Sequence, residues 1–300
     1  MRTKIAFSGI LAFFIVLLAM PLGHAAMIIM EKIFGQESIF PAAAILGFVG
    51  VGMLLVGVFT KNDTPATFWG LFGGLFVWTG WIEFAFVYYA HRYGVSPLME
   101  NGVVVTKPEY LIMPSSIGFW TVFMLYYFFG TKTGCCFFSW FQNKLKVGNK
   151  IELKSGTNRN IALVTFVELN MLLWTFYLVL LLAYDKHFFG DHHPVTYCIA
   201  FGSLLWSLIL FLKLIKIKHL GYAIRYAIPT VIIFWNFVEI LGRWNFFKVI
   251  WIYPSHYWLE IILLFAVFVA LIIISITGRK IMNRTDSQHL GERPKESPKA

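Results

Sequence analysis

Charged residues are scarce in this chain. Of its 300 residues 13% are charged, whereas soluble domains carry about 25%. Hydrophobic residues make up 58% of the chain and aromatic residues 18%. One interior cannot hide that much apolar surface, so the remainder must face lipid. The shortage of charge therefore excludes an ordinary soluble domain and indicates an integral membrane protein.

Cysteine and the common catalytic motifs are also lacking. The three cysteines, Cys135, Cys136 and Cys198, form no disulfide framework. The chain has no phosphate-binding P-loop, no G-x-G-x-x-G, no H-E-x-x-H and no G-x-S-x-G. Histidine boxes of the H-x-x-H-H kind, found in membrane desaturases and hydroxylases, are missing as well. Nothing in the sequence therefore indicates nucleotide chemistry in the cytoplasm.

Long hydrophobic runs are what the sequence has instead. A membrane-spanning helix needs about 20 apolar residues. Eight segments qualify or nearly do, at residues 5–30, 40–60, 66–90, 111–130, 160–184, 195–214, 222–242 and 256–278. We expect an all-α fold, a polytopic integral membrane helical bundle of about eight transmembrane helices that forms one domain over residues 1–278. Residues 279–300 are polar and contain proline, which predicts a disordered tail.

The distribution of lysine and arginine predicts the orientation. With a cytoplasmic N-terminus and eight spans, 19 of the 25 basic residues fall on the cytoplasmic side. The longest connection, residues 131–159, is basic and amphipathic and is expected to lie along the bilayer surface. We therefore expect a multi-pass protein of the cell membrane, of the bacterial inner-membrane type, with both termini cytoplasmic. The lipid bilayer is the expected partner; the +10 net charge then needs no nucleic-acid partner, and partner subunits stay unknown.

The N-terminus allows two interpretations. Arg2 and Lys4, the apolar run that follows, and the sequence Gly23-His24-Ala25 are typical of a cleaved signal peptide. Cleavage would leave seven spans. We favour retention as the first helix, because the apolar character continues through Met30.

Histidines collect on one side of this topology. Most of them fall at the extracytoplasmic face, and they include His91, His192, His193 and His256. Neutral imidazole binds copper, iron and zinc alike, so these four are candidate metal ligands. Glu260 follows His256 by four residues, where a carboxylate can fix the imidazole tautomer or join the metal site. The alternative is that imidazoles suit the interfacial zone, as tyrosine and tryptophan do.

The loop at residues 185–194, DKHFFGDHHP, holds two aspartates and three histidines. A histidine-rich tract of this kind can bind a divalent metal. His192 and His193 are neighbours in sequence, so in regular structure their side chains would point in different directions. A solvated loop is the alternative interpretation.

Three carboxylates lie within predicted spans: Glu83, Glu168 and Glu239. Glu83 and Glu239 lie near the extracytoplasmic ends of their helices, at the depth of the histidines. Arg243 follows Glu239 by one helical turn, which makes an ion pair between the two easy. Ionisable groups inside a membrane are costly and often functional. We therefore take Glu83, Glu239 and Arg243 as candidate catalytic residues, with Arg243 as the anchor for an anionic group.

The run from Glu239 through Arg243 to Tyr253 and Pro254 is similar to an E-x-x-x-R-aromatic run that ends in aromatic-Pro. That run occurs in the A subunit of the membrane-bound copper monooxygenases for ammonia and methane. The similarity covers about sixteen residues and assigns no family. It implies metal chemistry at the histidine-rich face.

Together these patterns predict a polar pocket near the extracytoplasmic face, lined by histidine, glutamate and arginine. Our first hypothesis is a metal- or haem-dependent membrane enzyme of the oxidoreductase class, or a subunit of one, that acts on a small or lipophilic substrate. Copper, iron, zinc or haem would each suit such a site. The second hypothesis is a proton-coupled small-molecule transporter, because carboxylates on several helices are what a proton relay needs. A non-catalytic assembly partner is the third.

Overall fold

The structure, a computed structural model, describes residues 6–100, 103–130, 136–145 and 160–291. Within them, eight helical stretches are long and apolar enough to cross a membrane. They cover Phe7–Gly35, Ser38–Phe59, Asp63–Arg92, Pro108–Phe129, Ile161–Tyr184, Pro194–Leu214, Leu220–Arg243 and Trp258–Thr277. Each corresponds to one of the predicted segments, so the all-α membrane bundle is confirmed.

The first two spans belong to one long helical element, α1 (Phe7–Phe59), which is broken at Gly35. Gly35 has φ 61° and ψ −176°, a backbone conformation that side-chain-bearing residues rarely adopt. A single glycine therefore reverses the chain between the two spans without a long loop.

The third span combines α2 (Asp63–Val77), a π-helical segment η1 (Trp78–Glu83) and α3 (Phe84–Arg92). Glycines let it approach the second half of α1 closely. A methyl group added at Gly80 would lie 2.6 Å from the carbonyl oxygen of Ala43 and 2.6 Å from the backbone nitrogen of Gly47. The close contact between the two helices therefore requires glycine at this position. Small residues commonly allow helices to approach one another closely in membrane bundles.

A short hairpin, β1 (Leu98–Glu100) and β2 (Val103–Thr106), leads into the fourth span. That span consists of α4 (Pro108–Ile112), η2 (Met113–Ser116), α5 (Ile117–Leu125) and η3 (Tyr126–Gly130). The predicted surface segment 131–159 contains α6 (Cys136–Lys144). Its other parts, residues 131–135 and 146–159, lie outside the described residues.

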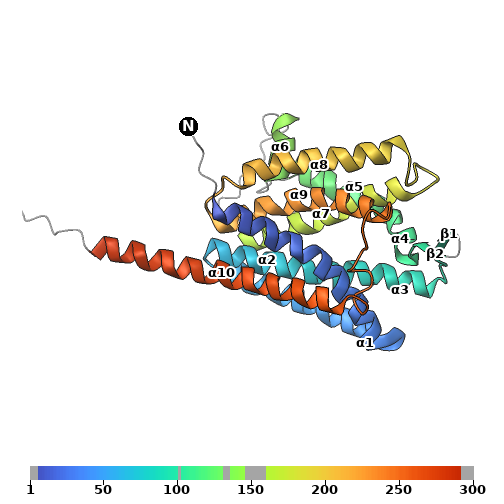
Figure 1. Cartoon of the computed structure of the whole chain (residues 1–300), viewed down its shortest axis with the longest axis horizontal. Coiled ribbons are helices and arrows are strands. Elements are labelled where there is room, and N and C mark those ends of the chain that lie inside the picture. The colour runs from blue at the N-terminus through green and yellow to red at the C-terminus, as the bar shows by residue number, and fades with distance from the viewer. Residues whose placement is uncertain (1–5, 101–102, 131–135, 146–159, 292–300) are drawn as a thin grey trace, which may run out of the picture.

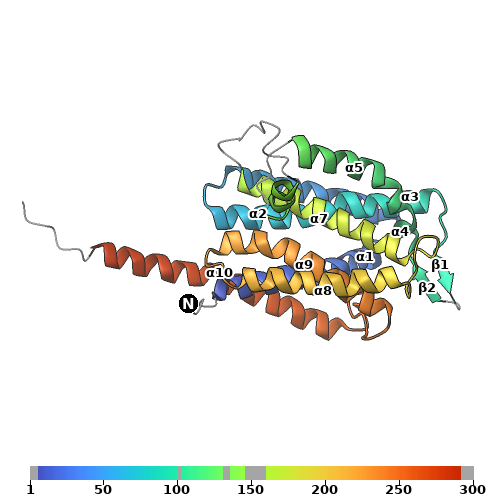
Figure 2. The same ribbon diagram turned by 90° about the horizontal axis from the view of Figure 1, so that it is seen from above.

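The remaining spans are α7 (Ile161–Tyr184), α8 (Pro194–Leu214), α9 (Leu220–Arg243) and α10 (Trp258–Gly291). The central helix is α9, which packs against α1, α2, α7 and α8 (Figure 2). Its core residues are inaccessible to solvent: Ala223, Ile224, Ala227, Ile228 and Val231. α10 lies at the edge, along α1 (Figure 1).

The helices create two distinct ends of the bundle. We call one the Arg225 end, where α1 and α9 begin and where Ala6 N–H donates to the carbonyl of Ile215. We call the other the Arg243 end, where α9 finishes and where Lys32 donates to Ser255. The β-hairpin lies at the Arg243 end (Figure 1). Which end faces the cytoplasm stays a prediction.

The C-terminal tail begins as a helix. α10 continues beyond the last span to Gly291, so the predicted boundary at residue 278 is not a helix end. Residues 292–300 lie outside the described part of the chain. The predicted disorder of the tail stays a prediction.

Candidate functional site

Four polar side chains from four helical elements meet near the Arg243 end. The Tyr177 hydroxyl donates to Glu83 Oε1 at 3.1 Å and lies 3.4 Å from His24 Nε2. His24 Nε2 lies in turn 3.8 Å from Glu239 Oε1. We call these residues, from α1, η1, α7 and α9, the Glu83 cluster. The structure thus brings together Glu83 and Glu239, two of the residues singled out in the sequence.

Tryptophans hold this cluster in position. Trp235 Nε1 donates to Glu239 Oε1 at 2.7 Å, and the Trp78 ring lies 5.4 Å from that of Tyr177. Trp78 and Glu83 begin and end the π-helical segment η1. Such segments are frequent at functional sites, because the extra residue per turn redirects the side chains.

The members of the cluster differ in accessibility. Glu83 is 4% exposed, whereas the side chains of His24 and Glu239 each keep 23% of their surface. A buried carboxylate is costly unless it is hydrogen-bonded, and Glu83 receives its bond from Tyr177. The cluster therefore has one buried carboxyl group, Glu83, and two partly exposed members, His24 and Glu239.

A second group of charges borders the cluster. Lys107 Nζ lies 3.8 Å from Glu31 Oε2 and 3.7 Å from Glu109 Oε1. The charges of Glu109, Lys107 and Glu31 act electrostatically on Glu83. Beside them the Tyr110 ring stacks on that of Tyr177 at 6.2 Å. The polar region therefore reaches from the cluster to the half-exposed Lys107.

Several buried polar atoms around the cluster have no hydrogen-bond partner in the described part of the protein. They include Glu109 Oε1, Tyr184 OH and Asn236 Nδ2. Glu109 Oε1 is within ion-pair range of Lys107 but beyond hydrogen-bond distance. Such atoms are rare in native proteins, and each indicates a water, an ion or a ligand. Asn236 lies one helical turn from Glu239, and Glu239 acts electrostatically on Tyr184. The region is therefore incompletely satisfied by protein groups alone.

Arg243 forms its ion pair with a residue that the sequence pattern did not indicate. Its Nε donates to Asp191 Oδ1, and its guanidinium carbon lies 4.3 Å above the Tyr184 ring. Glu239, the expected partner, bonds to Trp235 instead. Asp191 also accepts from Trp244 Nε1 at 2.7 Å through its backbone carbonyl. Arg243 thus fastens the 185–193 loop to the end of α9.

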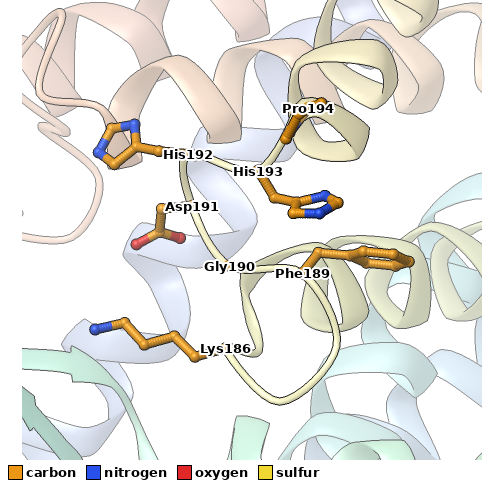
Figure 3. A pocket seen from close by; sticks show the side chains of 7 residues that line it. All are labelled: Lys186, Phe189, Gly190, Asp191, His192, His193 and Pro194. Carbon is orange, nitrogen blue, oxygen red and sulfur yellow. The ribbon is translucent and has the colours of Figure 1, made fainter.

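That loop lines an open pocket with Lys186, Phe189, Gly190, Asp191, His192, His193 and Pro194 (Figure 3). His192 and His193 point to opposite sides of the chain in Figure 3, as their adjacency predicted. His193 Nδ1 accepts from Val195 N–H at 3.2 Å and caps α8. His192 Nδ1 lies 3.4 Å from the Tyr197 hydroxyl. The two imidazoles therefore have separate local contacts.

The remaining candidate metal ligands lie apart from the cluster. His91 is exposed at the end of α3, and Glu260 is exposed in the first turn of α10. His256 is exposed and packs edge-on against Tyr257 at 4.6 Å. Within the described ranges, no group of three or more histidine, cysteine, aspartate or glutamate side chains is placed to hold a metal ion. The metal-ligand roles therefore stay predictions, without a preformed site.

Sequence reasoning placed His24 at the histidine-rich face if the first segment spans, but it left both His24 and Tyr177 out of the candidate site residues. His24 falls where a signal peptide also fits, and Tyr177 is one aromatic among many in an apolar helix. The only feature of the sequence that relates them to the site is their depth in the membrane. His24 and Tyr177 each lie within about a dozen residues of the end of a span at the Arg243 end.

Sequence reasoning also missed an ion pair at the Arg225 end. Arg225 donates to both carboxylate oxygens of Asp63, at 3.0 and 2.9 Å, and to the Thr67 hydroxyl. His219 Nδ1 lies 3.6 Å from Asp63 Oδ1. The pair joins the start of α2 to the start of α9.

The Glu83 cluster combines two carboxylates, an imidazole and a phenol at or near hydrogen-bond distance. Such a set can bind a proton, pass it along the chain of contacts, or bind a small polar ligand. The chain matches no family model, no curated protein and no solved structure, so a proposal for its function depends on the chemistry of these residues.

Proposed function

We propose that this protein is a proton-coupled carrier of a small molecule and that the Glu83 cluster is its proton-exchange site. The observation that supports this most directly is the chain of close contacts from Glu83 through Tyr177 and His24 to Glu239. Ionisable side chains within membrane spans mark proton relays and substrate pathways.

The residue types suit proton movement. A tyrosine hydroxyl is both donor and acceptor, so Tyr177 can take a proton on one side while giving one on the other. A neutral imidazole has one nitrogen of each kind, so His24 can do the same. Glu83 and Glu239 stand at the two ends of this relay and can hold the proton.

The cluster also connects proton binding to helix packing. Its four members come from α1, η1, α7 and α9, so a change in protonation alters contacts among four elements at once. A ligand or proton shifts a conformational equilibrium by its difference in affinity for the two states. A proton that breaks one of these contacts can therefore favour a different arrangement of the helices, as a carrier requires.

Buried polar side chains continue from the cluster toward the Arg225 end. They lie on α2, α7 and α9 and comprise Thr67, Thr165, Asn170, Thr230 and Asn236. Asn170 is seven residues before Tyr177, which corresponds to about 10 Å along a helix. This series places buried polar groups between the cluster and the Arg225 end, where Thr67, Thr165 and Thr230 donate to carbonyls four residues earlier in their own helices.

The second candidate is the metal- or haem-dependent enzyme. The specific observation in its favour is the 3.8 Å approach of His24 Nε2 to Glu239 Oε1. Two such atoms can be ligands of one transition metal after a small adjustment, because histidine–metal bonds are about 2.0–2.1 Å for zinc. Metal analysis and an absorbance spectrum of purified protein test it: bound copper, iron, zinc or haem that is lost in His24→Ala would favour the enzyme.

The proton site is tested by infrared spectroscopy during a pH titration of the protein in lipid. We expect a carboxyl band that titrates in the parent and is lost in Glu83→Gln or Glu239→Gln. Asp185→Asn, in the loop after α7, is the matched control and should retain the band. Unchanged titration in both glutamine variants would exclude the Glu83 cluster as the proton site.

A further inference from the structure

We infer that the solute of this carrier is a small organic cation that binds at the Glu83 cluster in exchange for a proton. The inference rests on the proposed function and adds the chemical class of the solute. Three independent features of the site support it: its charge balance, its unsatisfied polar atoms and its aromatic lining.

The charge balance favours a cation. Four carboxyl groups lie in the cluster or beside it: Glu83 and Glu239 belong to the cluster, and Glu31 and Glu109 lie next to Lys107. Lys107, the basic residue beside them, is shared between Glu31 and Glu109. Arg243 is held by Asp191. Carboxyl groups therefore outnumber the basic groups beside them, so the empty site would hold protons on some of them, and a bound organic cation can take the place of such a proton.

Unsatisfied atoms indicate that something other than protein completes the site. Glu109 is 4% exposed, and its Oε1 has no hydrogen-bond partner among the described residues. Two further buried atoms, Tyr184 OH and Asn236 Nδ2, also have no hydrogen-bond partner among the described residues. Leaving a buried polar group without a bond costs free energy, which a bound ligand or water removes. These atoms belong to residues next to the cluster, so a ligand bound there can supply the missing hydrogen bonds.

The aromatic lining distinguishes an organic cation from a metal ion. The rings of Trp78 and Tyr110 lie 5.4 and 6.2 Å from that of Tyr177. Across the cluster, Trp235 lies 4.9 Å from Trp251. Faces of tryptophan and tyrosine attract organic ammonium groups, and aromatic cages around such cations combine this attraction with carboxylates. A metal ion would instead need three or more ligating atoms, which the described residues do not offer as a group.

Exchange follows from the charge of the site. The titratable and charged groups near Glu83 are Tyr177, Glu109, Lys107 and Glu31. Near Glu239 they are His24, Tyr110, Tyr177 and Tyr184, and Trp235 donates to it. When a singly charged cation enters, one proton leaves a carboxyl group, so the net charge of the site stays constant. This avoids placing an additional charge in the low-dielectric bundle, which is costly.

The test uses the full chain in proteoliposomes that contain a pH-sensitive dye and are more acidic inside. Three labelled solutes are added outside: tetramethylammonium, methanesulfonate and erythritol, which are a permanent cation, a permanent anion and a neutral molecule. We expect tetramethylammonium to enter and the internal pH to rise with it, whereas the other two stay outside. Tetramethylammonium cannot cross as a neutral base, so passive leak does not imitate the result.

Single-residue variants test whether the Glu83 cluster is the site through which the cation enters. Glu83→Gln should lower the initial rate of cation entry by at least about tenfold, since losing one partner of a buried charge pair costs more than a factor of ten in affinity. Glu109→Gln should raise the tetramethylammonium concentration needed for half-maximal rate. Asp185→Asn should behave as the parent. Size-exclusion chromatography and circular dichroism confirm that each variant is folded.

The outcomes separate the two proposals. No entry of tetramethylammonium into vesicles of folded protein overturns the cation inference. If methanesulfonate or erythritol enters instead, and the Glu83 carboxyl band still titrates, the carrier function stands with another solute class. If none of the three enters and the band does not titrate, both proposals fall. Equal cation entry in Glu83→Gln and parent would also overturn the inference.

Discussion

The ion pair between Arg225 and Asp63 allows the sharpest prediction about stability. Arg225 donates two hydrogen bonds to Asp63 and a third to Thr67, and its side chain is only 16% exposed. Replacing Arg225 with Met keeps most of the volume but leaves the Asp63 carboxylate without its main partner. We therefore expect Arg225→Met to destabilise the protein strongly.

The magnitude follows from burial. Removing one partner of a buried ion pair costs about 3–5 kcal/mol. Asp63 keeps 28% of its side-chain surface, and His219 lies 3.6 Å from it, so part of the loss is relieved. We expect about 3 kcal/mol for Arg225→Met, the lower limit of that range. The double variant Asp63→Asn/Arg225→Met should recover at least about 1 kcal/mol, because no carboxylate is then left unpaired.

The assay is unfolding in mixed micelles with a rising fraction of sodium dodecyl sulfate, followed by circular dichroism. The parent, both single variants and the double variant form a double-mutant cycle. A single Arg225→Met variant within about 0.5 kcal/mol of the parent would refute the reasoning, because only solvated surface changes are that small. A double variant whose loss equals the sum of the two single losses would show that the two side chains are not coupled.

Three further predictions concern packing and the cluster. Gly221→Ala should destabilise the protein, because the added methyl would lie 1.9 Å from Asp63 Oδ1 and displace that carboxylate. Gly80→Ala should destabilise it by about 1–3 kcal/mol or more, since overpacking forces backbone shifts and the methyl would lie 2.6 Å from backbone atoms of α1. Trp235→Phe should cost about 1.5–3 kcal/mol if Glu239 is ionised, because it removes the donor that Glu239 accepts from. All three are measured by the same unfolding assay.

Matched controls exist for these changes. Gly52→Ala adds the same methyl in α1, where no atom lies within 4 Å, and should not lower the midpoint of unfolding, because alanine is the better helix former. Trp140→Phe alters a tryptophan that is 50% exposed and should have little effect. Losses in the controls as large as those in Gly80→Ala or Trp235→Phe would mean that the close contacts are not the cause.

The sequence by itself determined the class of fold and the helices. Eight apolar runs require eight spans, because an exposed backbone inside lipid must form its hydrogen bonds within a helix. The alternation of spans also placed Glu83 and Glu239 at one depth, near the histidines. These conclusions depend only on distance along the chain and on hydrophobicity, which a sequence contains directly.

Only the tertiary structure decided which faces of the helices meet. A soluble helix has a polar side and an apolar side, but a membrane helix is apolar all round, so periodicity does not reveal its buried face. For this reason the sequence paired Arg243 with Glu239, one turn away, whereas the fold brings Asp191 from a different connection.

The same reason explains the composition of the cluster. His24 and Tyr177 are 153 residues apart in sequence, and no local pattern relates them to each other. Close packing through glycines and the π-helical segment before Phe84 set the rotation of the third span, and with it the direction of Glu83. Depth in the membrane was therefore readable from the sequence, whereas the contacts at that depth depend on helix rotation, which only the packed bundle fixes.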